Sequence, residues 1–175
     1  GFHVIVALTV LNHIAYKGSK MLISLYAIEL GASPLTIGLL YSLYSFFSLF
    51  LALYAGRVSD RLGPRVPMLL GSLALGGGLI VPYLWDGLVA LFVSASLIGT
   101  LYIFYTVSAQ HLIGAFGDGH KRTRNYATFS LGVALTALLG PTLTGFLIDA
   151  IGHQRTYCVL ALLPLGPIAF LLFFA

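Results

Sequence analysis

Residues 56–65 read GRVSDRLGPR and stand between two long apolar runs. The preceding run, residues 30–56, and the following run, residues 66–85, contain no Asp, Glu, Lys or Arg. A helix needs about 20 apolar residues to cross the hydrocarbon core of a bilayer. The stretch therefore indicates a short charged connection between two antiparallel membrane-spanning helices.

The composition of the whole chain supports a membrane protein. Of the 175 residues, 59% are hydrophobic and 8% are charged, whereas a soluble domain has about 25% charged residues. A soluble enzyme, a nucleic-acid-binding module and a disordered chain are therefore excluded. The single cysteine, Cys158, excludes a disulfide framework and a cysteine-rich metal site.

The apolar runs predict six spans in an all-α bundle. Five runs are long enough alone, and the first becomes long enough when it continues through Lys17 and Lys20 to Ile28. Lipid offers no hydrogen-bond partners, so each span must satisfy its own backbone as a helix. The predicted spans are 3–29, 35–56, 67–85, 87–113, 125–149 and 156–175.

The charges of the connections predict the orientation. Two connections on one side carry six basic residues, and the other side carries Arg155 alone. This asymmetry places the basic side and the N-terminus in the cytoplasm, in a multi-pass protein of the inner or plasma membrane. The six basic residues are Arg57, Arg61, Arg65, Lys121, Arg122 and Arg124.

The first predicted span carries the strongest candidate binding residues. His13, Lys17 and Lys20 follow helical spacing and share one face, which Asn12 and Tyr16 flank. A lysine facing lipid at mid-depth costs about 2.5–3.5 kcal/mol on insertion scales. We therefore expect the lysines to face a watery cavity or a paired acid, and a cationic cavity suits a carboxylate or phosphate ester.

Two alternatives remain open for this helix. In the first, the long side chain of Lys20 extends along the helix and places its ammonium group at the outer interface. Lys17 lies roughly 18 Å from the helix end, which is too far for its side chain to reach the interface easily. Alternatively, the helix stops at Tyr16 and begins upstream of Gly1. On the fourth span, Tyr105 and Gln110 are further cavity candidates, although an interhelical hydrogen bond explains either. We expect Tyr44 to serve packing or to face lipid.

Residues 56–65 resemble the loop signature G-x-x-x-D-R-x-G-R-R/K of the major facilitator superfamily. Gly56, Asp60, Arg61, Gly63 and Arg65 match in place, whereas Pro64 replaces a basic residue. The resemblance implies the N-terminal half of a twelve-helix secondary transporter, with a central path lined by helices one and four. It also implies a small-molecule solute, a coupling ion (proton or sodium) and a C-terminal half that is missing here.

The signature also has a direct physical interpretation. Gly56 permits close helix packing, and Gly63 permits a turn with positive φ. Asp60 ends a helix whose dipole disfavours negative charge, so it requires a positive partner such as Arg61, Arg65 or a helix N-terminus. We interpret the group as a gating latch; the alternative is that the arginines only anchor the topology on lipid phosphates.

A second family-like stretch, residues 140–145, reads GPTLTG in the fifth span. Pro141 predicts a kink, and Gly140 and Gly145 predict close packing; ordinary packing of a kinked helix explains all three. In the fourth span, Ala95 stands where many proton-coupled family members carry arginine, which argues against the usual drug–proton antiport.

The sequence thus predicts a secondary transporter that moves a small solute by alternating access. The main alternative is a transporter-like membrane sensor or scaffold that moves nothing. A membrane-embedded enzyme is a weaker alternative, because paired acids and a nucleophile–base pair are missing from the apolar runs. We expect no cofactor, no nucleic-acid partner and no metal site, since the histidines lack ligand spacing. The chain ends within an apolar run, so we expect a longer protein.

Overall fold

The structure is a computed structural model that describes residues 1–174, all in helices and their short connections. The helices are α1 (Phe2–Glu29), α2 (Pro34–Leu62), α3 (Arg65–Leu84), α4 (Leu88–Ala115), α5 (Gly119–Ile151), α6 (His153–Leu162) and α7 (Leu165–Phe173). Helices α6 and α7 continue in one direction and form a single pass, interrupted at Leu163 and Pro164. Pro164 has no backbone N–H, so the hydrogen-bond ladder breaks there.

The bundle therefore makes six passes, as predicted. Within residues 1–174, five passes are both long and apolar enough to cross a membrane: α2, α3, α4, α5 and the α6–α7 pair. Helix α1 has 28 residues, which is long enough for the predicted span at 3–29. Polar residues, including Asn12, His13 and Lys17, interrupt its apolar sequence, and α1 is not among these five passes.

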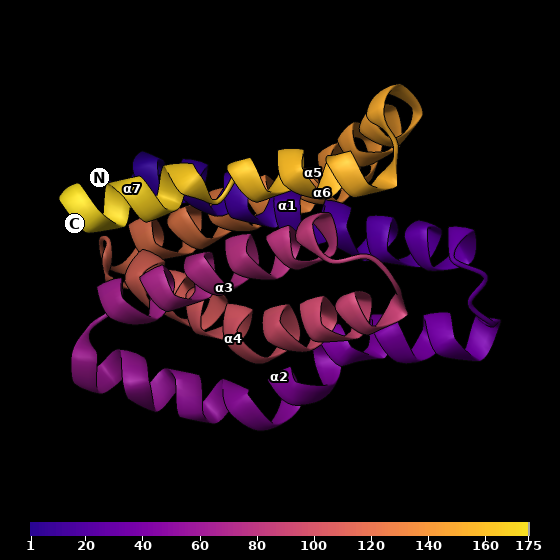
Figure 1. Ribbon diagram of the computed structural model, residues 1–175. Coiled ribbons are helices and arrows are strands. Elements are labelled where there is room, and N and C mark those ends of the chain that lie inside the picture. Colours follow the sequence, from indigo (N-terminus) through magenta and orange to yellow (C-terminus); the bar gives the residue numbers. More distant parts are fainter. Residues whose placement is uncertain (175) are drawn as a thin grey trace.

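The connections alternate between two ends of the bundle (Figure 1). Both termini lie at one end, together with the α2–α3 and α4–α5 connections. The six clustered basic residues belong to these two connections and their flanking turns, so we call this the basic end. The opposite end, which we call the distal end, carries the α1–α2, α3–α4 and α5–α6 connections.

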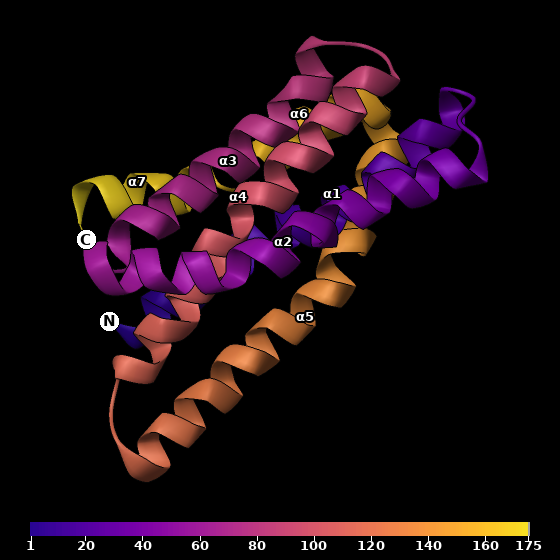
Figure 2. The ribbon, with the colours of Figure 1, turned by 90° about the horizontal axis from the view of Figure 1, so that it is seen from below.

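Two groups of helices dominate the packing. Helix α4 packs against both α2 and α3, and α1 packs along α5. Helices α2 and α5 do not pack against each other within the described residues, and α5 runs apart from α2 when the bundle is seen from below (Figure 2). Side chains of α1, α2, α4 and α5 line hollows on this side, which together form a cleft between the four helices.

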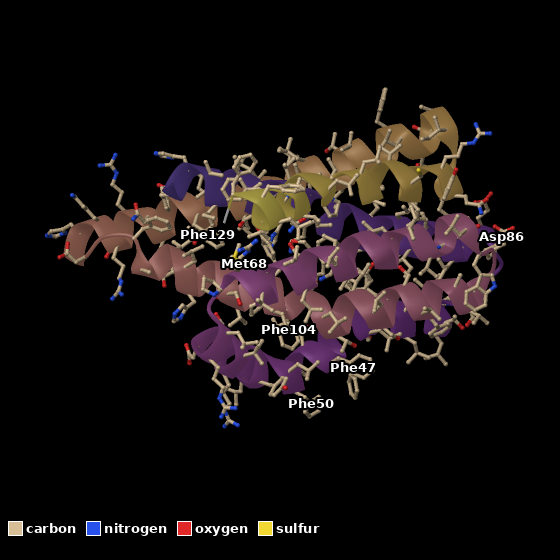
Figure 3. The ribbon with its side chains drawn as sticks, turned by 60° about the vertical axis from the view of Figure 1, so that its left-hand side comes forward. Phe47, Phe50, Met68, Asp86, Phe104 and Phe129 are labelled. Carbon is tan, nitrogen blue, oxygen red and sulfur yellow. The ribbon has the colours of Figure 1, made fainter. Side chains whose placement is uncertain are left out.

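The core lies between the closely packed helices. Met68 and Ile98 are fully buried between α3 and α4, and Leu22 is fully buried on α1. Phe50 on α2 is 70% exposed and points away from the bundle (Figure 3). Such an apolar outer surface is expected where lipid, rather than water, surrounds a helix.

Glycines set two of the closest helix contacts. A Cβ atom at Gly99 of α4 would overlap the backbone carbonyl oxygen of Leu43 on α2. A Cβ at Gly140 of α5 would lie 3.0 Å from the Gly18 nitrogen and from the Lys17 Cβ on α1. These pairs bring backbones together as small residues do in membrane bundles.

The helices at the basic end are longer than the predicted spans. Helix α2 continues to Leu62 and α5 begins at Gly119, so most of the predicted loop charges are helical. Arg and Lys are good helix formers, whereas counting apolar residues locates only the part of a helix within the membrane. The end of the last predicted span, Ala175, lies outside the described residues.

Candidate functional site

Three hollows follow one another along the cleft between α1, α2, α4 and α5. The distal hollow has a volume of about 300 Å³ and is lined by Lys17, Lys20, Met21, Ser24, Tyr41, Ala137 and Pro141. The central hollow is about 420 Å³, and its lining includes His13, Tyr16, Lys17, Tyr44, Ser48 and Tyr102. The proximal hollow is about 360 Å³ and includes His13, Thr106, Gln110, Tyr126 and Val133.

Neighbouring hollows share wall residues and so lie next to each other, in a row that we call the path. Lys17 borders both the distal and the central hollow. His13, Thr106 and Val133 border both the central and the proximal hollow. The His13, Lys17 and Lys20 face of α1 thus follows the path from the proximal to the distal hollow.

The two lysines are half-buried and lack acidic partners. Both ion pairs found in residues 1–174 involve histidines, at the two ends of the bundle. The Lys20 ammonium lies over the rings of Tyr16, Tyr41 and Tyr44, at 5.0, 5.4 and 5.7 Å from their centroids. Aromatic faces attract a cation at such distances, so Lys20 has a defined position.

Tyrosines form one wall of the central hollow. The Tyr16 ring stacks on the Tyr102 ring at a centroid distance of 4.7 Å, and the Tyr44 ring meets Tyr16 edge-on at 5.6 Å. The Tyr44 hydroxyl donates a hydrogen bond to Ser19 Oγ at 3.0 Å, which fixes its ring. Three helices, α1, α2 and α4, therefore contribute to a single aromatic surface.

His13 connects α1 to α4 beside this wall. Its Nδ1 lies 3.0 Å from the Tyr102 hydroxyl and 3.2 Å from the Thr9 carbonyl oxygen. In one tautomer Nδ1 donates to the carbonyl, and in the other it accepts from the hydroxyl. Either arrangement leaves Nε2 without a role in these contacts.

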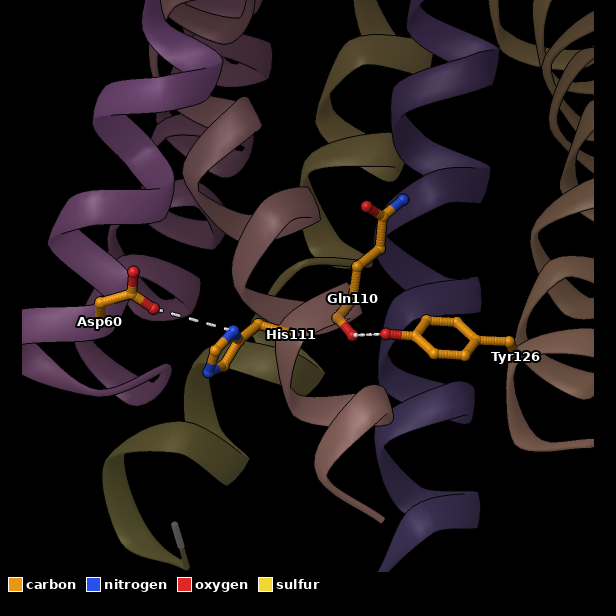
Figure 4. Close-up of polar contacts among 4 residues, drawn as sticks. All are labelled: Asp60, Gln110, His111 and Tyr126. Carbon is orange, nitrogen blue, oxygen red and sulfur yellow. Dashed lines mark hydrogen bonds and ion pairs between the residues drawn. The ribbon is translucent and has the colours of Figure 1, made fainter. Parts of the chain in front are cut away.

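The structure places the other sequence candidates differently. Asn12 Nδ2 donates to Ser72 Oγ on α3 at 2.9 Å, and the Tyr105 hydroxyl lies 2.9 Å from Thr9 Oγ1. Both residues are buried between helices and border none of the three hollows. Gln110 borders the proximal hollow, and its backbone carbonyl oxygen accepts a hydrogen bond from the Tyr126 hydroxyl at 3.2 Å (Figure 4).

Asp60 faces a histidine at the basic end. Its Oδ1 lies 3.9 Å from Nδ1 of His111 on α4 (Figure 4), and both side chains are mostly exposed. The contact joins the last turns of α2 and α4. We expected Arg61, Arg65 or a helix N-terminus as the partner of Asp60, but a side chain at the end of a helix can also face a side chain of the neighbouring helix.

Arg65 binds backbone instead. Its Nε donates to the Leu171 carbonyl at 2.7 Å, and its Nη2 donates to the Leu172 carbonyl at 2.9 Å. The last carbonyls of a helix lack partners within the helix, so Arg65 caps α7 from the start of α3. Gly63 has a φ of +79°, as its turn requires. Gly56 is not required by close packing, because an added Cβ would lie 3.9 Å from the Val107 side chain, an ordinary van der Waals contact.

The glycine–proline stretch positions α5 against α1. Helix α5 continues through Pro141, and Gly140 meets Gly18 and Lys17. A Cβ at Gly145 would make only an ordinary 3.5 Å contact with Met21. Gly140 is therefore the residue of this stretch that close packing requires.

Sequence reasoning missed part of the site. Tyr44 packs in the core, as one of its two expected roles required, but it also lines the central hollow with Ser48, one turn further along α2, which was not expected. The i, i+4 spacing of two polar residues was the available signal. It was weak because α2 is apolar on nearly all sides.

The fold is that of known transporters. The chain superposes on a mutant of the peptide transporter POT crystallised with sulfate, with a TM-score of 0.86 and 20% identity over 97% of this chain and 37% of that one. The same mutant crystallised with alafosfalin gives a TM-score of 0.88 and 19% identity over 98% and 37%. The chain thus spans little more than a third of these transporters. No curated protein matches the chain significantly.

The sequence profile described as Major Facilitator Superfamily matches residues 5–175. This match covers nearly the whole chain and agrees with the signature at residues 56–65 and with the six-pass helical fold. The chain belongs to the major facilitator superfamily.

Proposed function

We propose that this chain is the N-terminal half of a secondary active transporter that moves a small anionic solute by alternating access. The observation that carries the proposal is the position of Lys17 and Lys20, which border hollows in the membrane-embedded cleft and have no acid within ion-pair distance in residues 1–174. Ionisable side chains within a membrane-spanning helix raise the free energy of insertion and typically mark solute or ion pathways. A bound anion supplies the missing countercharge.

Alternating access requires a second half that faces the cleft. Helices α2 and α5 do not pack against each other in the described residues, so a partner bundle has room to contact the cleft between them. Rocking of two halves about a central site exposes it to each side in turn. A coupling ion, either a proton or sodium, provides the driving force in this proposal.

The Asp60–His111 contact is proposed as a latch at the basic end. It joins α2 and α4, and a surface ion pair is worth only about 0–1 kcal/mol. Such a weak contact breaks and reforms readily when helices move. We propose that it biases the position of the cytoplasmic gate.

The test is uptake by the full-length protein in proteoliposomes. The panel contains small aromatic and aliphatic carboxylates and their neutral amides. We expect anion uptake by the wild type and at least about a tenfold loss in Lys17→Met, because one removed ion pair in a partly buried site exceeds 1.4 kcal/mol. Lys121→Met is the matched control, since Lys121 is exposed at the basic end.

Three results would contradict the proposal. Absence of flux for every anion with the wild type rejects transport, and anion-induced thermal stabilisation without flux then favours a sensor. Equal flux in Lys17→Met and the wild type rejects the assignment of the cavity. Uptake of the neutral amides in preference to the carboxylates rejects an anionic solute.

A further inference from the structure

The distal hollow brings two lysines to one small space. Lys17 and Lys20 both line it, and positions i and i+3 of a helix place their Cβ atoms about 5–6 Å apart. The other walls, Met21, Ser24, Tyr41, Ala137 and Pro141, carry no charge. Two like charges in a half-buried space repel each other. A ligand with two negative charges therefore offsets more of the repulsion between the two ammonium groups than a ligand with one.

The tyrosine contacts fix one of these charges in place. The Lys20 ammonium is within 6 Å of three ring centroids contributed by α1 and α2. Cation–π contacts of this kind favour the charged form without neutralising it. Lys20 is therefore a prepositioned cation that keeps its attraction for an anion.

The neighbouring central hollow has a different character. Its lining adds apolar side chains, including Leu49, Ala52, Ile98 and Ile103, to the stacked rings of Tyr16 and Tyr102. Its volume of about 420 Å³ falls within the range of small-molecule sites. Lys17 borders both hollows. A ligand beside Lys17 can therefore place its charged part in the distal hollow and its apolar part in the central hollow.

We propose that the solute is an amphipathic organic dianion. Its doubly charged headgroup lies between Lys17 and Lys20 in the distal hollow, and its apolar or aromatic body lies against Tyr16 and Tyr102 in the central hollow. This inference rests on the proposed function and names the substrate class of the same cleft.

The test compares ligands that differ in charge on the same ring. Binding to the full-length protein in nanodiscs is measured by calorimetry for phenylphosphonate, benzenesulfonate and benzenesulfonamide, at a pH above the second ionisation of the phosphonate. We expect phenylphosphonate to bind at least about tenfold more tightly than benzenesulfonate, because each additional ion pair in a partly buried site exceeds 1.4 kcal/mol. Benzenesulfonamide binds weakest. Methylphosphonate, which lacks the ring, binds at least about tenfold more weakly than phenylphosphonate, since a buried ring carries a large apolar area.

Variants at Lys20 test the headgroup assignment. In Lys20→Met the preference for the dianion falls to less than about threefold, because Lys17 alone faces the headgroup. Lys20→Arg keeps the charge and keeps the preference, which also shows that position 20 tolerates substitution. Lys121→Met is the matched control, since it removes the charge of a lysine that is exposed at the basic end and borders none of the three hollows.

The outcomes separate this inference from the proposed function. Equal affinity for phenylphosphonate and benzenesulfonate, or an unchanged preference in Lys20→Met, overturns the dianion assignment even if Lys17-dependent carboxylate uptake persists. Equal affinity for methylphosphonate and phenylphosphonate overturns the position of the apolar body. If the wild type neither binds these anions nor transports any carboxylate, the proposed function itself fails.

Discussion

Two residues of the family signature, Arg65 and Asp60, make different kinds of contact at the basic end. Arg65 donates two hydrogen bonds to the last carbonyls of α7. In contrast, Asp60 Oδ1 lies 3.9 Å from His111 Nδ1, and both side chains are mostly exposed. Hydrogen bonds from a charged donor contribute about 1.5–3 kcal/mol, and an exposed ion pair contributes far less. Arg65 therefore stabilises the packing of α7 against α3, whereas the contact of Asp60 is weak, as the proposed latch requires.

We expect these two positions to respond differently to neutralisation. Arg65→Gln should lower the free energy of unfolding by about 1–2 kcal/mol, because α7 loses its cap, and should reduce the Tm of the full-length protein in detergent. Asp60→Asn should change it by less than about 0.5 kcal/mol but should alter the exchange rate in proteoliposomes. Arg57→Gln is the control, since Arg57 is exposed and makes none of the hydrogen bonds found for residues 1–174.

The opposite pattern would contradict this division. If Asp60→Asn destabilises the protein as much as Arg65→Gln does, the acid is a structural residue rather than a latch. If Asp60→Asn leaves both stability and exchange unchanged, the signature at this position only sets the topology.

Helix contacts depend on a few glycines that bring backbones together. The α2–α4 contact is the clearest, because an added Cβ at Gly99 would overlap the Leu43 carbonyl oxygen and approach the Tyr44 Cα at 3.0 Å. Backbone atoms cannot move aside as the end of a flexible side chain can. The two helices that carry Tyr44 and Tyr102 are therefore held at a fixed separation.

We expect Gly99→Ala to destabilise the bundle by about 1–3 kcal/mol, or more if α2 separates from α4, as overpacking does. Gly77→Ala is a matched control within α3, because an added Cβ there has nothing within 4 Å. The control should be neutral or stabilising by up to about 1 kcal/mol, since alanine favours helix more than glycine does. Thermal unfolding of the full-length variants in detergent measures both, and equal Tm values for the pair would contradict the close contact.

The whole molecule has an asymmetric charge distribution that predicts its orientation. The connections of the distal end and their flanking turns carry Arg155 as their one Lys or Arg, whereas the basic end carries six, and such an asymmetry predicts that the basic end lies in the cytoplasm. Cys158 is the one cysteine of this chain, so a background in which Cys158 and every cysteine of the remaining protein are replaced by serine permits single new cysteines. Lys121 and Arg155 are exposed at the two ends.

We expect a membrane-impermeant thiol reagent to label Arg155→Cys on intact cells. Lys121→Cys should be labelled only after the membrane is permeabilised, because its side chain would face the cytoplasm. Labelling of Lys121→Cys on intact cells, with protection of Arg155→Cys, would reverse the predicted orientation.

The sequence predicted the fold far better than the direction of individual side chains. Apolar runs and sparse charges indicated six passes, because the bilayer imposes a fixed length on each helix. The rotation of each helix depends on its neighbours, so helical spacing placed Asn12 near the lysine face although it bonds Ser72 on α3. Tyr44 packs in the core, as expected, but its place in the wall of a hollow was not predicted, because an almost wholly apolar helix gives no sign of which side faces a hollow.

The contact between Gly140 and Lys17 has a consequence for how the specificity of this protein can diverge. The Lys17 Cβ lies 3.0 Å from the position of a Cβ at Gly140. A larger residue at position 140 therefore displaces α1 and, with it, the Lys17 ammonium group. Ala137 and Val133, one and two turns before it on α5, border the hollows without taking part in this contact. In a laboratory evolution experiment, adaptive substitutions for new solutes should therefore accumulate at positions 133 and 137, while glycine at 140 is retained by purifying selection.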